Sequence, residues 1–454
     1  MLDQSFSSEN FRRIWDLRIR RGEDLARYFP AVASSIADLE DARRSLRMSV
    51  SGTGGVRSRG ANELVDQYEL AKVKRDDVLR DQLSMIALEV NNRIDKGNFN
   101  VGFKPSKVVR GKQTYRIDRR DPASYFICRQ VEQNLKSAFH LKPPNRGLVA
   151  EQLFLALNDR TQKFVMRTDI KAFFESIPHD QLRQLLRRTP GLSRTTSRFV
   201  DALLLEHETW TGSPIGLPRG LGISTALAEA FLSQLDDVLS NQQGVTFYAR
   251  YVDDIVLVFA AGHHHGPGDA RKLVVRGCIK SIGLSLNAGK TQYLLLPAAS
   301  AAKRKRLSYL GYEFDVSAFP VSVDISANRA KRYRERIESS FAAHGGVKGD
   351  ASADRILIDR MRFLAGNTRL SNNKRQALVG IYFSNSLLST PSSRILALDV
   401  CYKKVLASAA LPPSLHAEMS AISFAEGFKH RKYSVFSPKR LQQIVRVWKY
   451  SDET

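Results

Sequence analysis

Aspartate residues at two places in the sequence are the first candidates for chemistry. Asp169 follows the short apolar run Phe164–Met166, which is typical of a buried strand, and aromatic residues at helical spacing come soon after it. We therefore expect Asp169 where a strand gives way to a helix. Open sheets bind ligands at that end of a strand, although an aspartate that only caps the following helix would occupy the same place.

A second acidic site is the adjacent pair Asp253–Asp254. It lies between two runs rich in β-branched and aromatic residues, which predicts a hairpin with the pair at its turn. Adjacent carboxylates repel each other unless solvent or a cation offsets their charge. A solvated turn would suffice, but the following run, Ile255–Phe259, is wholly apolar. A polar pair between buried strands favours a metal site over a surface turn.

If their strands are neighbours, Asp169 and Asp253 form a two-metal centre. Carboxylate oxygens of this kind select Mg²⁺ or Mn²⁺. Two such ions, about 4 Å apart, activate an attacking hydroxyl and stabilise a leaving pyrophosphate. The spacing of the aspartates thus predicts phosphoryl-transfer chemistry on a rigid sheet.

The composition limits which proteins could carry such a site. The chain has 454 residues, enough for about three domains, and 43% of them are hydrophobic, enough for a sizeable core. Its 70 Lys and Arg exceed its 46 Asp and Glu, and the net charge of +24 requires an anionic partner, either nucleic acid or a membrane surface. Three scattered cysteines fit a reducing cytoplasm, and no apolar run is long enough for a membrane span.

The hydrophobic pattern changes twice along the chain. Residues 1–95 are mostly helical in pattern, residues 96–325 alternate short strand-like runs with helical stretches, and residues 326–454 return to helix. The last segment holds 22 Lys and Arg against 10 Asp and Glu, about half of the excess charge. The helices predicted in it span Ala327–Phe341, Ile356–Leu364, Lys374–Leu387 and Ile395–Ala409.

Three motifs, in the same order, resemble those of reverse transcriptases. Tyr251–Asp254 resembles the Y-x-D-D box, Asp169 with Phe173–Phe174 resembles the first palm motif, and Gly216–Gly220 is similar to the G-x-P-Q-G box. The resemblance implies an α+β right-hand polymerase. Its parts would be a helical N-terminal extension (1–95), reverse transcriptase fingers and palm (96–325), and a helical, basic thumb and C-terminal region (326–454).

The resemblance also implies roles for single residues. Asp169 and Asp253 would be the main ligands of two Mg²⁺ or Mn²⁺ ions, with Asp254 and Ile170 beside them. Lys290, in a stretch that resembles the fourth palm motif, would give a proton to the leaving pyrophosphate or screen it, unless it is an ordinary surface lysine. The nucleotide-binding residues would be Arg110, Lys112, Arg116, Ile170, Phe173, Phe174, Pro218, Arg219 and Gly220.

Four of these positions carry specific expectations. Phe174 matches a gate position, where a bulky ring clashes with a 2′-hydroxyl and favours deoxynucleotides, although either ring of the Phe173–Phe174 pair could be core. Arg219 stands where many members of the family have glutamine, so the nucleotide contacts at this point are open. Arg110 and Arg116, in a stretch that resembles the fingers hairpin, would hold the triphosphate.

The function that follows from the resemblance is RNA-directed DNA polymerase. The sequence is most similar to the bacterial abortive-infection and defence-associated reverse transcriptases, which implies antiphage defence in the cytoplasm without a membrane partner. The expected partners are an RNA template or noncoding RNA, dNTPs, the DNA product, a second defence protein from the same operon, and a further copy of the chain. Two alternatives stay open: a template-independent or protein-primed DNA polymerase on the same palm, and a group II intron-type maturase or RNA-binding scaffold. The run His263–His265 is interpreted as a loop, not as a metal cluster.

Overall fold

A computed structural model of the chain describes residues 3–52, 59–118, 120–142, 144–260, 268–296, 305–345, 350–370 and 377–451. The run His263–His265 lies outside these residues. The chain divides into two compact units, each described by itself. Unit 1 comprises Met1–Lys142 and Phe174–Ser233, and unit 2 comprises Pro143–Phe173 and Gln234–Thr454. The division at residues 95 and 325 stays a prediction.

Unit 1 is largely helical, with one two-stranded hairpin. Its elements are α1 (Ser8–Arg20), η1 (Ala26–Tyr28), α2 (Pro30–Gly52), α3 (Arg59–Asp95), β1 (Phe103–Val109), β2 (Lys112–Ile117), α4 (Pro122–Ala138), α7 (His179–Arg187) and α8 (Arg194–Thr211). The short helix α6 (Phe173–Ser176) begins in unit 2, and α9 (Gly222–Ser240) ends there.

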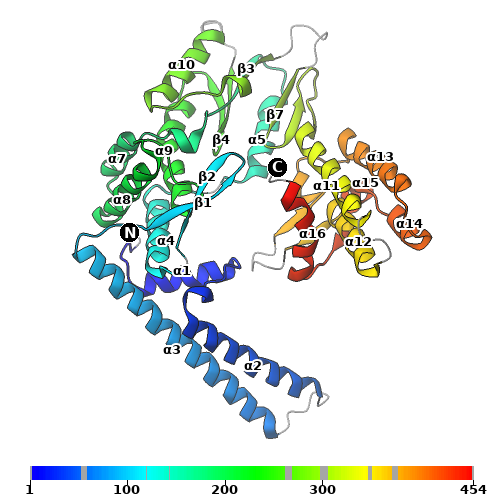
Figure 1. Cartoon of the computed structure of the whole chain (residues 1–454). Helices are drawn as coiled ribbons and strands as arrows, with labels where there is room; N and C mark the ends of the chain where they lie inside the picture. Colours follow the sequence, from blue (N-terminus) through cyan, green and yellow to red (C-terminus); the bar gives the residue numbers. More distant parts are fainter. Residues whose placement is uncertain are drawn as a thin grey trace. The chain divides into compact units, whose positions relative to one another are not determined.

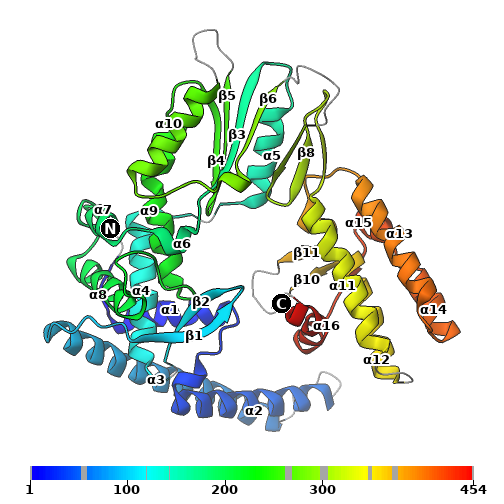
Figure 2. The same ribbon diagram turned by 45° about the horizontal axis from the view of Figure 1, so that its top comes forward.

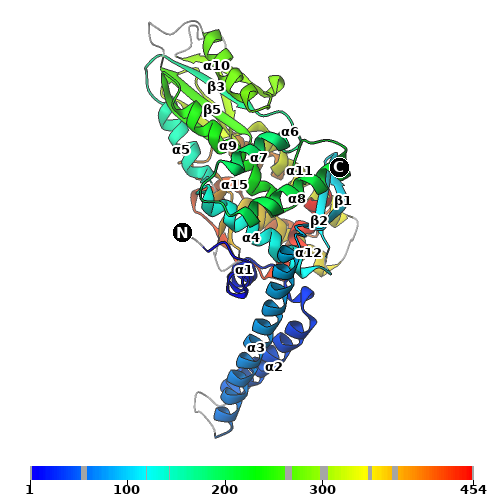
Figure 3. The same ribbon diagram turned by 90° about the vertical axis from the view of Figure 1, so that its left-hand side faces the viewer.

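The helical pattern predicted for the N-terminal segment is confirmed. Helices α2 and α3 lie side by side as a long hairpin that extends away from the other helices of unit 1 (Figures 1 and 3). The apolar residues Leu79, Leu83, Ile86 and Val90 recur at helical spacing and are buried, because this part of α3 packs against α1 and α4.

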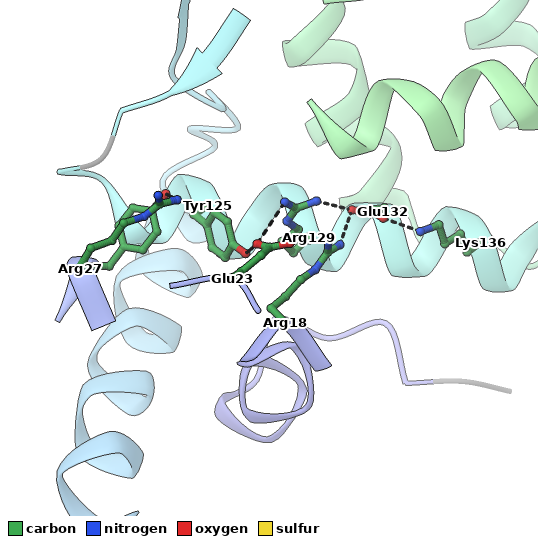
Figure 4. A network of polar contacts seen from close by, with 8 residues as sticks. Arg18, Glu23, Arg27, Tyr125, Arg129, Glu132 and Lys136 are labelled. Carbon is green, nitrogen blue, oxygen red and sulfur yellow. Dashed lines mark hydrogen bonds and ion pairs between the residues drawn. The ribbon is translucent and has the colours of Figure 1, made fainter. Parts of the chain in front are cut away.

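A buried charge network fixes α1 to α4 (Figure 4). Glu132 of α4 has a side chain only 5% exposed, and it contacts Arg18 of α1, Arg129 and Lys136. Burial raises the pKa of the Glu132 carboxyl, but hydrogen bonding to Lys136 and the three positive charges outweigh burial, so the pKa is lowered. The carboxylate is therefore ionised, and it is the shared partner of three cations.

Unit 2 contains the principal sheet and the C-terminal helices. Its elements before residue 326 are α5 (Arg146–Leu157), β3 (Lys163–Asp169), β4 (Val245–Tyr251), β5 (Asp254–Ala260), α10 (Gly268–Ser281), η2 (Ala288–Lys290), β6 (Gln292–Leu296), β7 (Arg306–Tyr309), β8 (Tyr312–Asp315) and β9 (Ser322–Ile325). Those after it are α11 (Ala327–Gly345), α12 (Ala351–Ala365), β10 (Asn367–Arg369), β11 (Leu378–Gly380), η3 (Phe383–Asn385), α13 (Ser393–Ser408), α14 (Pro413–Ser420), α15 (Phe424–Lys429), β12 (Tyr433–Ser434) and α16 (Pro438–Ser451).

The principal sheet has the strand order β4-β5-β3-β6, and its ladders are antiparallel (Figure 2). On one face, Val165 and Val258 belong to the same buried core as Leu153 of α5. On the other face, Arg271 of α10 lies over the ring of Phe164, 5.8 Å from its centroid. Both faces of β3 and β5 are therefore covered, and this explains why the sequences of these strands are continuously apolar.

The helix predicted at Lys374–Leu387 is wrong where the structure describes it. From residue 377 the chain forms β11 and η3, and β11 joins β10 and β12 in a small sheet. Gly380 has a φ of 136°, and a Cβ there would lie 2.4 Å from the carbonyl oxygen of Gly366. This close backbone approach favours a strand. The other three predicted helices correspond to α11, α12 and α13.

Among the described helices, none has the length and apolar character needed to cross a bilayer.

Candidate active site

The antiparallel register of β3 and β5 brings the predicted carboxylates to one end of the sheet. Asp169, the last residue of β3, pairs with Asp254, the first residue of β5. Asp253 lies in the β4–β5 turn, where its carbonyl oxygen accepts a hydrogen bond from the Ile170 amide at 3.1 Å. The turn is tight, with Val252 at a left-handed φ of 59°. The predicted hairpin is therefore confirmed, and it is the neighbour of the strand that ends in Asp169.

Negative charge is concentrated at this end of the sheet. Burial raises the pKa of the Asp253 carboxyl, and the charge of Asp169 raises it further. Burial also raises the pKa of Asp254, against the opposing effect of Arg167. Asp169 itself is only 7% exposed. Carboxylates in this state are stabilised by a cation, and their hard oxygen atoms suit a divalent one.

Two cationic side chains contact these carboxylates in the structure. Arg167 of β3 donates from Nε and Nη2 to the two oxygens of Asp254, each at 2.9 Å. Lys290 of η2 places its Nζ 3.0 Å from each oxygen of Asp169. Within the described residues, no three His, Cys, Asp or Glu side chains are gathered in a metal-binding arrangement. Positive charge from the chain itself thus compensates two of the three carboxylates.

The loop that carries Lys290 is fixed to β3 by its backbone. The amide of Asn287 donates to the carbonyl oxygen of Asp169 at 2.7 Å, and the amide of Lys171 donates to that of Ser285 at 2.9 Å. The Lys290 side chain remains 56% exposed. The structure therefore brings together the lysine and the aspartate that the sequence placed in separate motifs.

Side chains that the sequence did not single out hold the β4–β5 turn. Arg250 donates to the carbonyl oxygen of Val252 at 2.9 Å, and Asp236 of α9 accepts from Arg250 at 2.7 Å through each of its oxygens. Tyr309 of β7 donates to the carbonyl oxygen of Asp254 at 3.2 Å. In the sequence, Arg250 could be noticed only as an arginine within a strand-like run. Its partners, Asp236 and the carbonyl oxygen of Val252, are known only from the fold.

In unit 1, the predicted basic hairpin is formed by β1 and β2. Its turn is Arg110–Gly111, where both residues have a left-handed φ, 50° and 69°, as a two-residue hairpin turn requires. The side chains of Arg110 and Arg116 are exposed. Lys112 places its Nζ 3.5 Å from Oε2 of Glu175. The hairpin thus presents basic side chains to solvent.

The glycine-rich box Gly216–Gly220 forms a tight turn, with a φ of 89° at Gly216 and 97° at Gly220. A Cβ at Gly220 would lie 2.7 Å from the carbonyl oxygen of Tyr115, so glycine is required there. The amide of Tyr115 donates to the carbonyl oxygen of Arg219, also at 2.7 Å. Pro218 is buried next to them. The turn is therefore joined to β2 through its backbone.

The two phenylalanines after Asp169 differ in their surroundings. Phe173 is buried, with 2% of its surface exposed, and is core. Phe174 is only partly buried and lies beneath the guanidinium of Arg219.

The predicted site residues are divided between the two units. Unit 2 holds Asp169, Ile170, Phe173, Asp253, Asp254 and Lys290, and unit 1 holds Arg110, Lys112, Arg116, Phe174, Pro218, Arg219 and Gly220.

Comparisons with known proteins bear on the middle of the chain. Residues 117–314 match the family model described as reverse transcriptase (RNA-dependent DNA polymerase). Over 113 residues, 24% of this chain, the sequence is 28% identical to an uncharacterized 91 kDa protein in cob intron of Schizosaccharomyces pombe. The chain spans 14% of the length of that protein. Among solved structures, an apo telomerase from Candida tropicalis, truncated from its C-terminal domain, has a TM-score of 0.33 and 10% identity, and the match covers 62% of this chain and 73% of that one. A TM-score of that size is too low to support an assignment.

Proposed function

We propose that this chain is an RNA-directed DNA polymerase, because residues 117–314 match the reverse transcriptase family model. We place its active site at the end of the principal sheet that carries Asp169, Asp253 and Asp254. The observation that carries the proposal is the pairing of Asp169 with Asp254, which places Asp253 in the adjoining turn. Enzymes of this family use divalent metal ions. In this chain, Asp169 and Asp253 would hold two Mg²⁺ or Mn²⁺ ions, with Asp254 and Ile170 beside them.

The donor set fits such ions, because it consists of carboxylate oxygens whose repulsion raises the pKa of Asp253 beyond the effect of burial. When bound, the ions activate the attacking hydroxyl and offset the charge of the triphosphate. The side chains of the protein keep the ligands in place. Arg167 orients Asp254, and Arg250 fixes the turn that carries Asp253. Lys290 supplies a positive charge at Asp169 from an exposed side chain, and we assign to it the protonation of the leaving pyrophosphate.

The residues of unit 1 complete the proposal. Arg110, Lys112 and Arg116 supply positive charge for the triphosphate, and arginine suits bidentate contacts with phosphate. The box that contains Pro218 and Gly220 offers backbone for close approach to a nucleotide. Phe174 is assigned to the position next to the sugar, where its ring excludes a 2′-hydroxyl.

The test is primer extension by the full-length chain with an RNA template, a DNA template or no template, each with dNTPs and with rNTPs. The proposal predicts Mg²⁺- or Mn²⁺-dependent DNA synthesis whose sequence copies the RNA template. Synthesis without a template would favour the template-independent alternative. Labelled nucleotide bound covalently to the protein would favour protein priming.

A second candidate function is that of an intron maturase. Two observations favour it: the similarity to a protein in the cob intron, and the excess of basic residues after residue 325. Splicing of a candidate intron in the presence and absence of the protein distinguishes the two functions, because a maturase without polymerase activity would promote splicing but extend no primer.

We also propose that the physiological role is antiphage defence in the cytoplasm, with a noncoding RNA or a second protein from the same operon as partner, or a further copy of the chain. The support is the similarity of the N-terminal extension and of the box Gly216–Gly220 to defence-associated reverse transcriptases. Cells carrying Asp253→Asn should lose protection in a plaque assay. Unaltered protection would contradict a role that depends on polymerase activity.

A further inference from the structure

Arg219, the arginine at the position where the related box commonly has glutamine, joins two consecutive residues of α6. Its Nη2 lies 3.0 Å from Oε2 of Glu175, and its Nε donates to Oε1 of the same carboxylate. Its guanidinium carbon lies 4.8 Å from the centroid of the Phe174 ring. A planar guanidinium can form a two-point ion pair and cover an aromatic ring at the same time. One side chain thus contacts both the carboxylate and the ring.

The backbone around Arg219 is fixed on two sides. Toward α6, the amide of Leu217 donates to the carbonyl oxygen of Phe174 at 2.7 Å. A Cβ at Gly216 would lie 3.2 Å from Cα of Glu175, so the two segments touch through their backbones. Toward β2, the carbonyl oxygen of Arg219 accepts from Tyr115. These backbone contacts fix the position of the Arg219 backbone, and from that position its side chain reaches the Phe174 ring.

The charge of Arg219 is already matched within the protein. Burial raises the pKa of the Glu175 carboxyl, but the hydrogen bond and charge of Arg219, together with the charge of Lys112, outweigh burial and lower the pKa. Glu175 is therefore ionised at neutral pH. A guanidinium that is bound by a carboxylate and placed over a ring is poorly suited to anchor a phosphate, whereas it is well suited to restrict the ring.

We infer that Arg219, held by Glu175, is a positioning residue that fixes the ring of Phe174 and thereby sets the discrimination between deoxyribonucleotides and ribonucleotides. This inference rests on the proposed function, which assigns Phe174 to the sugar of the incoming nucleotide. Glutamine at this position would lack the fork that binds both carboxylate oxygens and the plane that covers the ring. The arginine of this box and the glutamate that follows Phe174 therefore act as one unit.

The experiment compares kcat/KM for a dNTP with that for the matching rNTP in the full-length chain. Arg219→Gln should reduce the ratio about three- to tenfold, as expected for the loss of a partly exposed cation–π contact and of its anchoring ion pair. Glu175→Gln should reduce it similarly, because it releases the same guanidinium. In a Phe174→Ala background, where the ring is absent, Arg219→Gln should cause no further change. Arg183→Gln is the matched control, since Arg183 pairs with Asp180 and Asp201 on α7 and α8, and it should leave the ratio unchanged.

Three outcomes would overturn the inference. An unchanged ratio in Arg219→Gln, together with a reduced ratio in Phe174→Ala, would mean that the ring is held without the arginine. An equal rise in KM for both nucleotides, with an unchanged ratio, would make Arg219 a nucleotide contact. An active Phe174→Ala enzyme with an unchanged ratio would remove the gate and the inference together but leave the polymerase assignment intact. If the wild-type chain extends no primer, the proposed function itself fails, and the two failures are thereby distinguishable.

Discussion

His207 of α8 should make the stability of unit 1 depend strongly on pH. The residue is 5% exposed, and its ring lies 5.4 Å from that of Tyr115 and 6.1 Å from that of His179, centroid to centroid. Its Nδ1 is among the buried atoms without a hydrogen-bond partner in the described part of the chain. Burial, together with the charge of His179, lowers the pKa of His207 from 6.5 to about 4. The folded protein therefore keeps this ring neutral.

The size of the effect follows from the two pKa values. Between pH 6.5 and about pH 4, His207 is protonated in the unfolded chain but neutral in the folded chain. The free energy of unfolding therefore falls as the pH falls through this range. For pKa values of 6.5 and about 4, the loss between pH 7.5 and pH 5.0 is about 2 kcal/mol, and below pH 4 it approaches about 3.4 kcal/mol.

The perturbation is His207→Leu, which removes the titrating group and keeps an apolar side chain at a buried position. Unfolding in urea would be measured at pH 7.5 and pH 5.0, with hydrogen exchange of α8 peptides as the local readout. Between the two pH values, wild type should lose about 2 kcal/mol more than the variant. Equal losses in the two proteins would refute the reasoning, because they would show that His207 titrates alike in the folded and unfolded chains.

Three other perturbations test contacts in the candidate active site, in the box Gly216–Gly220 and in the buried charge network of Glu132. Arg167→Met should abolish primer extension and lower the melting temperature, because it leaves the partly buried Asp254 carboxylate without its cation; adding Asp254→Asn should restore the melting temperature but not the activity. Gly220→Ala should lower stability by about 1–3 kcal/mol in thermal unfolding, since the new Cβ would meet the carbonyl oxygen of Tyr115 at a left-handed φ. Glu132→Ala should lower the free energy of unfolding in urea by about 1–3 kcal/mol, because Arg18, Arg129 and Lys136 lose their shared partner while Arg18 and Arg129 keep Glu23; an unchanged free energy would contradict this account of the network.

The parts of the fold that depend on a local sequence pattern could be predicted from the sequence. The strand that ends in Asp169, the hairpin turn at Asp253 and the long helix α3 each follow from residues within one short window. The helix predicted at Lys374–Leu387 failed because a close backbone approach at Gly380 decides the local structure, and spacing of apolar residues does not report such contacts.

The contacts between distant segments were not predictable. Arg167 meets Asp254 because the strand register pairs their two strands, and 87 residues separate them in the sequence. Arg219 and Glu175 are 44 residues apart in the sequence. Each is a charged residue of a kind that is common on protein surfaces, so its type alone does not indicate a partner. Single-sequence patterns describe which side chains share a face of one element, whereas these pairs depend on how elements pack.

The central claim is that Asp253 is part of a polymerase active site, and its most direct test is template-copying DNA synthesis by Asp253→Asn. Asp237→Asn is the matched control, because Asp237 is an exposed aspartate on α9 outside the proposed site. Both variants should fold with the melting temperature of wild type or above it, since Asp253→Asn removes a partly buried charge from a group of mutually repelling carboxylates. The account predicts that primer extension on RNA falls to background in Asp253→Asn and is unchanged in Asp237→Asn. Extension by a folded Asp253→Asn chain at the wild-type rate would contradict it.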